Sequence, residues 1–247
     1  MLYANLLLNV LYHIEIEMKI RESCLQTGNF IYKPGISLTK QDFHLQRGSL
    51  GLQRGFSGYY LPAELITEKY GLEKDSYILF LGRLVPEKGI RYLVEAFKNV
   101  KTDKKLIIAG GSSDTDSFMN ELKDLAKDDD RIIFTGFVQG QILKELYSNA
   151  YVYTLPSDLE GMPLSLLEAM SYGNCCLVSN IPECTEVVED KALVFKKSDV
   201  NDLFTKIQKA CDNPEMVMKI KEQATDFIFR KYNWDFVTKE TMNLYRR

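Results

Sequence analysis

The stretch Glu160-Gly161-Met162-Pro163-Leu164-Ser165-Leu166-Leu167-Glu168 joins a turn to the start of a helix. Pro163 suits the first helical position, because its missing N–H would have no intrahelical partner there. The amides that follow are free, and the helix dipole places partial positive charge beside them. Glu160 and Glu168 flank this helix start, so the stretch predicts an anion site suited to a ligand with phosphates in its middle and hydroxyl-rich sugars at both ends. An ordinary strand–turn–helix with two solvated glutamates is the alternative interpretation.

The composition of the 247 residues is that of a soluble globular protein, with 45% hydrophobic and 26% charged residues. A formal net charge of −3 provides no basic field for nucleic acid. No apolar run is long enough to span a membrane, and the apolar start lacks the basic region of a signal peptide. The five cysteines show no CxxC spacing and only two histidines occur. We therefore expect free thiols in a reducing, cytoplasmic setting and no zinc site.

Short apolar runs alternate with amphipathic segments from about residue 77 onward, which is typical of βα units around a parallel sheet. The predicted strands are 77–81, 105–109, 132–135, 151–155, 175–179 and 192–195. The predicted helices are 90–100, 117–127, 141–149, 163–172, 199–212, 214–231 and 234–246. The strands are nearly continuously apolar, which indicates a sheet covered on both faces. The predicted fold class is therefore α/β.

The part of the chain before residue 59 follows a different pattern. Residues 46–58 are rich in glycine and show neither helical nor strand periodicity, as in a linker. Residues 1–45 are too few to build a core of their own. We therefore divide the chain into a poorly defined segment, 1–58, and a domain, 59–247.

A second motif, Phe80-Leu-Gly-Arg-Leu-Val-Pro-Glu-Lys-Gly89, directly follows the first predicted strand. Ligands of open α/β sheets bind outside the carboxyl ends of the strands, so Arg83 and Lys88 can reach one pocket. Arginine offers a planar fork for phosphate oxygens and lysine a compact charge. Gly82 permits a close approach of the backbone to a ligand. The alternative is a solvated loop in which Lys88 pairs with Glu87.

Three further segments carry polar or aromatic groups near predicted element ends. Gly136, Phe137 and Val138 follow a strand and are suited to flank a flat nucleobase, although Phe137 fits a core position equally well. The triplet 114–116 matches the DxD pattern of some metal-dependent sugar transferases, but aspartate before a helix is also what N-capping requires, and we favour capping. We interpret the triplet 128–130 as a solvated helix end.

Together these motifs resemble family-4 glycosyltransferases, which are retaining enzymes with the two-lobed B-type fold. The resemblance covers roughly residues 60–247 and rests on the order and spacing of Gly82-Arg83, Glu87-Lys88-Gly89, Gly136-Phe137-Val138, the segment 156–163, Glu168-Ala169-Met170, Gly173, the segments 179–183 and 186–189, Tyr232-Asn233-Trp234 and Tyr245. It implies a Rossmann-like parallel sheet flanked by helices, the C-terminal lobe of that fold, with the N-terminal lobe largely missing. Residues 1–58 would then be a remnant of the acceptor lobe and its linker.

The resemblance also implies a role for each site residue. Arg83 and Lys88 would bind the donor diphosphate and stabilise charge on the leaving group, and Glu160 would contact the hydroxyls of the donor sugar. Glu168 would bind the ribose of the nucleotide. The other implied donor-binding residues are Gly82, Gly136, Phe137, Val138, Gly161, Met162, Pro163 and Leu164. Such enzymes usually need no metal cofactor, so none is expected.

The implied function is the transfer of a sugar, with retention, from a nucleotide-sugar to a saccharide or lipid-linked acceptor. A lipid-linked acceptor would bring this cytoplasmic protein to the inner membrane face. The alternatives are a non-catalytic nucleotide-sugar binding module, or a fragment that needs a separate acceptor lobe. A sugar-nucleotide epimerase of the same fold ranks lower, because His13 and His44 lie far from the other motifs.

The predicted last helix normally packs across the acceptor lobe in this family. Its residues Trp234, Phe236, Val237 and Tyr245 would therefore present an apolar face to a partner lobe, to residues 1–45 or to a second copy of the chain.

Overall fold

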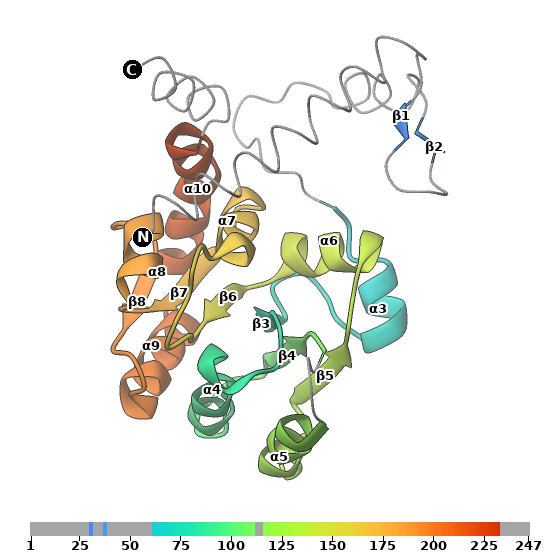
Figure 1. Cartoon of the computed structure of the whole chain (residues 1–247), viewed down its shortest axis with the longest axis vertical. Helices are drawn as coiled ribbons and strands as arrows, with labels where there is room; N and C mark the ends of the chain where they lie inside the picture. Colours follow the sequence, from blue (N-terminus) through green and yellow to red (C-terminus); the bar gives the residue numbers. More distant parts are fainter. Residues whose placement is uncertain (1–29, 32–36, 39–60, 112–115, 233–247) are drawn as a thin grey trace. The chain divides into compact units, whose positions relative to one another are not determined.

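The computed structural model describes residues 30–31, 37–38, 61–111 and 116–232, which are coloured in Figure 1. The predicted linker 46–58, the helix 234–246 and its apolar face, and residue Tyr245 lie outside the described residues, as does most of the segment 1–45. Residues 57–231 form one compact unit, and the fold below is that of this unit. In the other unit, strands β1 (Phe30–Ile31) and β2 (Ser37–Leu38) pair antiparallel. The domain boundary at residue 58 stays a prediction.

A six-stranded parallel sheet forms the centre of the compact unit. Its strands are β3 (Tyr77–Leu81), β4 (Lys105–Ala109), β5 (Ile132–Gly136), β6 (Val152–Leu155), β7 (Cys175–Ser179) and β8 (Leu193–Phe195). Their order across the sheet is β5-β4-β3-β6-β7-β8, which is the Rossmann order with its reversal between β3 and β6. The α/β class and the Rossmann-like parallel sheet are confirmed, and every strand begins and ends within one residue of its predicted bounds.

Helices cover both faces of the sheet (Figure 1). They are α3 (Leu65–Tyr70), α4 (Ile90–Phe97), α5 (Asp116–Ala126), α6 (Gly140–Asn149), α7 (Leu164–Ser171), α8 (Pro182–Val188), α9 (Val200–Asp212) and α10 (Pro214–Lys231), with a 3-10 turn η1 (Pro86–Lys88). Figure 1 shows α4, α5 and α9 on one face and α3, α6 and α7 on the other. The predicted break at Pro214 is confirmed, whereas α3 and α8 were not predicted. Within the described residues, no helix is long and apolar enough to cross a membrane.

Alternate residues of the strands face the two helical layers. Ile78 and Phe80 of β3 belong to a buried cluster that includes Leu93 of α4. Tyr77 points to the other layer, where its hydroxyl donates to the carbonyl of Leu146 in α6 at 2.7 Å. Both sets are almost fully buried, which explains why the strand sequences are nearly continuously apolar and do not alternate with polar residues.

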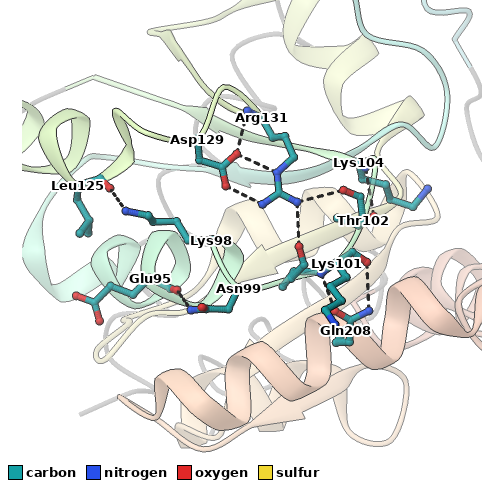
Figure 2. Close-up of polar contacts among 11 residues, drawn as sticks. Glu95, Lys98, Asn99, Lys101, Thr102, Lys104, Leu125, Asp129, Arg131 and Gln208 are labelled. Carbon is teal, nitrogen blue, oxygen red and sulfur yellow. Dashed lines mark hydrogen bonds and ion pairs between the residues drawn. The ribbon is translucent and has the colours of Figure 1, made fainter.

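Arg131 joins two loops at the amino ends of β4 and β5. Its Nε and Nη2 donate to the carboxylate of Asp129 at 2.9 and 2.7 Å. Its Nη1 donates to the carbonyls of Val100 and Thr102 at 2.9 and 3.1 Å. Figure 2 shows the guanidinium between Asp129 and Thr102, with Gln208 of α9 bound to the backbone of Lys101 nearby. The loop after α4 is thereby tied to the loop after α5.

The interpretation of residues 128–130 as a solvated helix end is wrong for Asp129. Its side chain is only 11% exposed, and it pairs with Arg131. The hydrogen bonds from Arg131 lower the pKa of this carboxyl below its ordinary value of 3.8. A lowered pKa means that the pair contributes its full stability above 3.8 and loses it as the pH falls through the lowered value.

We expect Arg131→Ala to lower the free energy of unfolding by about 1.5–3 kcal/mol, because it removes hydrogen bonds to a charged group and to two backbone carbonyls. Arg91→Ala is the matched control, since Arg91 pairs with Glu121 and the two side chains are 47% and 48% exposed. That exposed pair should contribute at most about 1 kcal/mol. Urea denaturation of the three proteins measures both effects.

The pH dependence provides a second readout for the same variant. The difference in unfolding free energy between the wild type and Arg131→Ala should shrink as the pH falls from neutrality to below 3.8, because Asp129 becomes protonated. A constant difference over this range would show that the Asp129 pair contributes nothing, and that the other contacts of Arg131, with the two carbonyls and the Phe97 ring, account for the whole effect.

Candidate active site

A pocket of about 310 Å³ lies at the carboxyl ends of β3, β4 and β5. Its lining consists of Leu81, Gly82, Arg83, Ala109, Gly110, Gly111, Phe137 and Val138. The structure therefore brings together residues of two separate predicted motifs, the one after β3 and the one after β5. Gly136 immediately precedes them as the last residue of β5 and has a left-handed φ of 69°.

Gly110 is a part of the pocket to which the sequence analysis assigned no role. A Cβ at this position would lie 1.8 Å from the carbonyl oxygen of Gly82, so the loops after β3 and β4 touch only because Gly110 has no side chain. A Cβ at Gly82 would meet only the ring of Phe80, at 3.4 Å, so the role predicted for Gly82 in ligand approach stays a prediction. The signal in the sequence was the glycine pair 110–111 directly after an apolar strand.

Phe137 and Arg83 are both exposed at this pocket. The Phe137 side chain is 75% exposed, so the alternative interpretation of Phe137 as a core residue is wrong. Arg83 is also exposed, and among the described residues its guanidinium has no hydrogen-bond or ion-pair partner. An exposed aromatic ring and an unengaged planar cation thus line one pocket, as a flat, anionic ligand requires.

Lys88 and Glu160 form an ion pair beside the point where the strand order reverses. Lys88 ends η1 after β3, and Glu160 lies in the β6–α7 loop, residues 156–163. The Nζ–Oε1 distance is 2.7 Å, and the side chains are only 17% and 6% exposed. The Ser157 hydroxyl donates to the same Oε1 at 2.6 Å. The alternatives in which Lys88 pairs with Glu87, or in which Glu160 is solvated, are therefore wrong.

Backbone contacts hold the loop after β3 against the β6–α7 loop. Gly89 has a left-handed φ of 65°, and a Cβ there would lie 2.0 Å from the carbonyl oxygen of Pro156. The amide of Asp158 donates to the carbonyl of Glu87 at 2.8 Å. The carboxylate of Asp158 accepts from the Tyr92 hydroxyl of α4 at 3.0 Å. These contacts hold the two loops at the separation at which Lys88 and Glu160 form their ion pair.

The start of α7 differs by one residue from the prediction. Pro163 is the N-cap and not the first helical residue, because its ψ of 75° lies outside the helical region. The Leu164 amide donates to the carbonyl of Met162 at 2.9 Å, so the prediction that it is free for an anion is wrong in this structure. Within the described residues, the amides of Gly161 and Met162 have no hydrogen-bond partner.

Glu168 lies four residues after Leu164 on the same exposed face of α7. Its Oε2 accepts a hydrogen bond of 3.1 Å from the hydroxyl of Tyr147, a residue of α6 that belongs to none of the predicted motifs. The predicted site residues thus lie at or after the carboxyl ends of β3, β5 and β6, in the loops that follow these strands and, for Leu164 and Glu168, in α7. In the part of the chain that the structure describes, no three His, Cys, Asp or Glu side chains are grouped so as to hold a metal ion.

Comparison with known proteins shows the family of this chain. The sequence profile of the family described as Glycosyl transferases group 1 matches residues 63–227. The chain belongs to this family. An uncharacterized glycosyltransferase of Methanocaldococcus jannaschii is 31% identical over 179 residues, which are 70% of this chain and 45% of that protein. The O-antigen chain mannosyltransferase B of Escherichia coli is 29% identical over 194 residues, 75% of this chain and 50% of that protein.

This group 1 glycosyltransferase chain therefore spans about half the length of the two relatives. Among solved structures, Anabaena HepE in complex with UDP and glucose superimposes with a TM-score of 0.69 at 16% identity, over 77% of this chain and 56% of that one. The likeness concerns the fold alone. It confirms that the parallel sheet with its helices is the C-terminal, Rossmann-like lobe of the B-type glycosyltransferase fold.

The contact between Gly89 and Pro156 can be tested against a matched glycine. Gly89→Ala and Gly140→Ala both place a side chain at a left-handed φ, 65° and 64°, but only at Gly89 would the new Cβ overlap another backbone atom. We expect Gly89→Ala to lower the free energy of unfolding by about 1–3 kcal/mol more than Gly140→Ala, because the two loops must move apart. Urea denaturation measures the difference, and equal losses would show that the loops separate without cost.

Proposed function

We propose that this domain is the donor half of a retaining family-4 glycosyltransferase, which transfers a sugar from a nucleotide-sugar to a saccharide or lipid-linked acceptor. The observation that carries the proposal is the path of the loop after β3. At Arg83 this loop lines the pocket that contains Phe137, and at Lys88 it forms the ion pair with Glu160. A nucleotide-sugar has the same order of parts: a flat base, a diphosphate and a sugar.

The charges of Arg83, Lys88 and Glu160 fit the chemistry of glycosyl transfer. Breaking the bond between a sugar and a diphosphate builds negative charge on the diphosphate and positive charge on the sugar carbon. Fixed cations beside the diphosphate stabilise that transition state. Arg83 has no partner among the described residues, and Lys88 uses one of its three N–H donors on Glu160. Both can therefore bind phosphate oxygens without breaking the ion pair.

In this proposal the two carboxylate oxygens of Glu160 have different partners. Its Oε1 accepts from both Lys88 and Ser157. Within the described residues, its Oε2 has no hydrogen-bond partner and can accept from the hydroxyls of the donor sugar. Phe137 and the backbone at Val138 would contact the base, the amides of Gly161 and Met162 the phosphate or sugar, and Glu168 the ribose.

The comparisons support the class of ligand and suggest a setting. HepE was crystallised with UDP and glucose, and one relative is an O-antigen chain mannosyltransferase. We therefore propose a role in polysaccharide biosynthesis, in the cytoplasm and at the inner membrane face when the acceptor is lipid-linked. Catalysis also needs an acceptor held in place, which we assign to a partner lobe. Charge on the diphosphate would be neutralised by Arg83 and Lys88, so we propose that no metal is required.

The donor assignment predicts that Arg83→Ala binds nucleoside diphosphates about 10- to 150-fold more weakly, the loss of a charge-assisted contact of about 1.5–3 kcal/mol. Calorimetric titration of the full chain with UDP, GDP and ADP and with their sugar conjugates, in EDTA, measures this loss and names the base. Arg91→Ala, an exposed arginine on α4, should bind as the wild type does. Normal binding by Arg83→Ala would contradict the assignment of the diphosphate to this pocket. Binding that requires a divalent metal would contradict the proposed metal independence.

Transfer is tested separately from binding. Incubation of the chain with the nucleotide-sugar that binds and with a panel of saccharide and lipid-linked acceptors should yield a glycoside of the same anomeric configuration as the donor, which NMR spectroscopy identifies. Inversion would contradict the family-4 assignment. Binding without transfer to any acceptor would favour the non-catalytic module or a half-site that needs its acceptor lobe.

A further inference from the structure

Tyr147 of α6 makes a direct contact with a predicted ligand-binding residue. Its side chain is buried, and its hydroxyl lies 3.1 Å from Oε2 of Glu168 and 3.4 Å from the carbonyl oxygen of Ser165. Both acceptors belong to α7, the helix that follows the β6–α7 loop. Glu168 itself is exposed, so a buried donor holds one end of an otherwise free side chain.

The position of Tyr147 is fixed at both its backbone and its ring. Its carbonyl accepts from the side-chain amide of Asn174 at 2.8 Å, and the same amide donates to the carbonyl of Ala169 in α7 at 3.0 Å. Its ring stacks on Tyr172, with 5.4 Å between the ring centroids and 13° between the planes. The ring of Tyr153 packs against it at 5.9 Å. The hydroxyl therefore has little freedom relative to α7.

The chemistry of the contact defines its direction. Burial, followed by the nearby Tyr153 and Glu168, raises the pKa of Tyr147 far above its ordinary value, so the hydroxyl keeps its proton. A carboxylate only accepts hydrogen bonds, so Tyr147 is the donor to Oε2. Among the described residues, Oε1 of Glu168 has no hydrogen-bond partner. One oxygen is thus held by the protein and the other is available to a ligand.

We propose that Tyr147 is a positioning residue, which orients the Glu168 carboxylate so that Oε1 accepts from the vicinal ribose hydroxyls of the donor nucleotide. The inference rests on the proposed function, which assigns the ribose to Glu168. A glutamate on a helix surface loses conformational freedom when it binds a ligand. Tyr147 and the rings around it remove part of that freedom before the nucleotide arrives.

The test compares two variants that each remove one buried tyrosine hydroxyl from the full chain. Tyr147→Phe loses the contact with Glu168. Tyr151, which directly precedes β6, donates a 2.7 Å hydrogen bond to the carbonyl of Ala210 in α9, and Tyr151→Phe loses this bond. The probes are the ribonucleoside diphosphate that binds and its 2′,3′-dideoxy analogue. Tyr147→Phe should bind the ribonucleotide about 3- to 10-fold more weakly and the dideoxy analogue with unchanged affinity. Tyr151→Phe should change neither affinity.

A second variant keeps the proposal testable if Tyr147→Phe does not fold. Tyr172→Ala removes the stacked ring but keeps the Tyr147 hydroxyl, and it should lose part of the same preference for the ribonucleotide. Thermal unfolding of each variant shows whether it is folded under the conditions of the titration. Equal weakening for both nucleotides, or no weakening in Tyr147→Phe, would overturn the positioning role.

Glu168→Ala separates failure of this inference from failure of the proposed function. If Glu168→Ala loses the preference for the ribonucleotide and Tyr147→Phe keeps it, the ribose assignment holds and the positioning role is wrong. If Glu168→Ala keeps the preference, or if the wild type binds both nucleotides equally, the ribose assignment fails and the positioning role fails with it.

Discussion

The ion pair between Lys88 and Glu160 is the interaction on which the arrangement of the site depends. Both side chains are largely buried, at 17% and 6% exposure, and a charge taken from water without a partner is strongly destabilising. Each residue therefore needs the other at the place where the sheet reverses its strand order. Their meeting requires the loop after β3 to touch the β6–α7 loop, which it does at Gly89 and Pro156. Removing either charge would leave the other buried and unpaired.

The same pair places hydrogen-bond donors and an acceptor side by side in one short region. The loops after β3 and β6 lie side by side at the reversal of strand order, and they lead to helices on opposite faces of the sheet, α4 and α7. Between these loops a lysine with spare donors lies beside a carboxylate whose second oxygen has no hydrogen-bond partner among the described residues. A phosphate suits the first group and a sugar hydroxyl the second. At the other end of the strands, the amino end, Arg131 joins two loops and has a structural role.

Long, periodic elements were predictable because their signals are local. Strands 77–81, 105–109 and 175–179 and helix 214–231 agree with the structure residue for residue. Helix α3 was missed because its cap is not local: the amides of Glu64 and Ile66 both donate to Oε2 of Glu145, which is 79 residues from Ile66. Helix α8 was missed because it has only seven residues and no side-chain cap. The one local start signal of α8, Pro182 followed by Glu183, was not used in the sequence analysis.

The sequence by itself determined the parallel α/β class, the strand-to-helix turn between Glu160 and Glu168, and the place of Arg83 in the loop after the first strand. Only the tertiary structure decided that Lys88 pairs with Glu160 across 72 residues, and that Tyr147 reaches Glu168 from a helix without a motif. Periodicity and turn chemistry report contacts between near neighbours along the chain. Strand order decides which distant loops meet, and the site is made at those meetings.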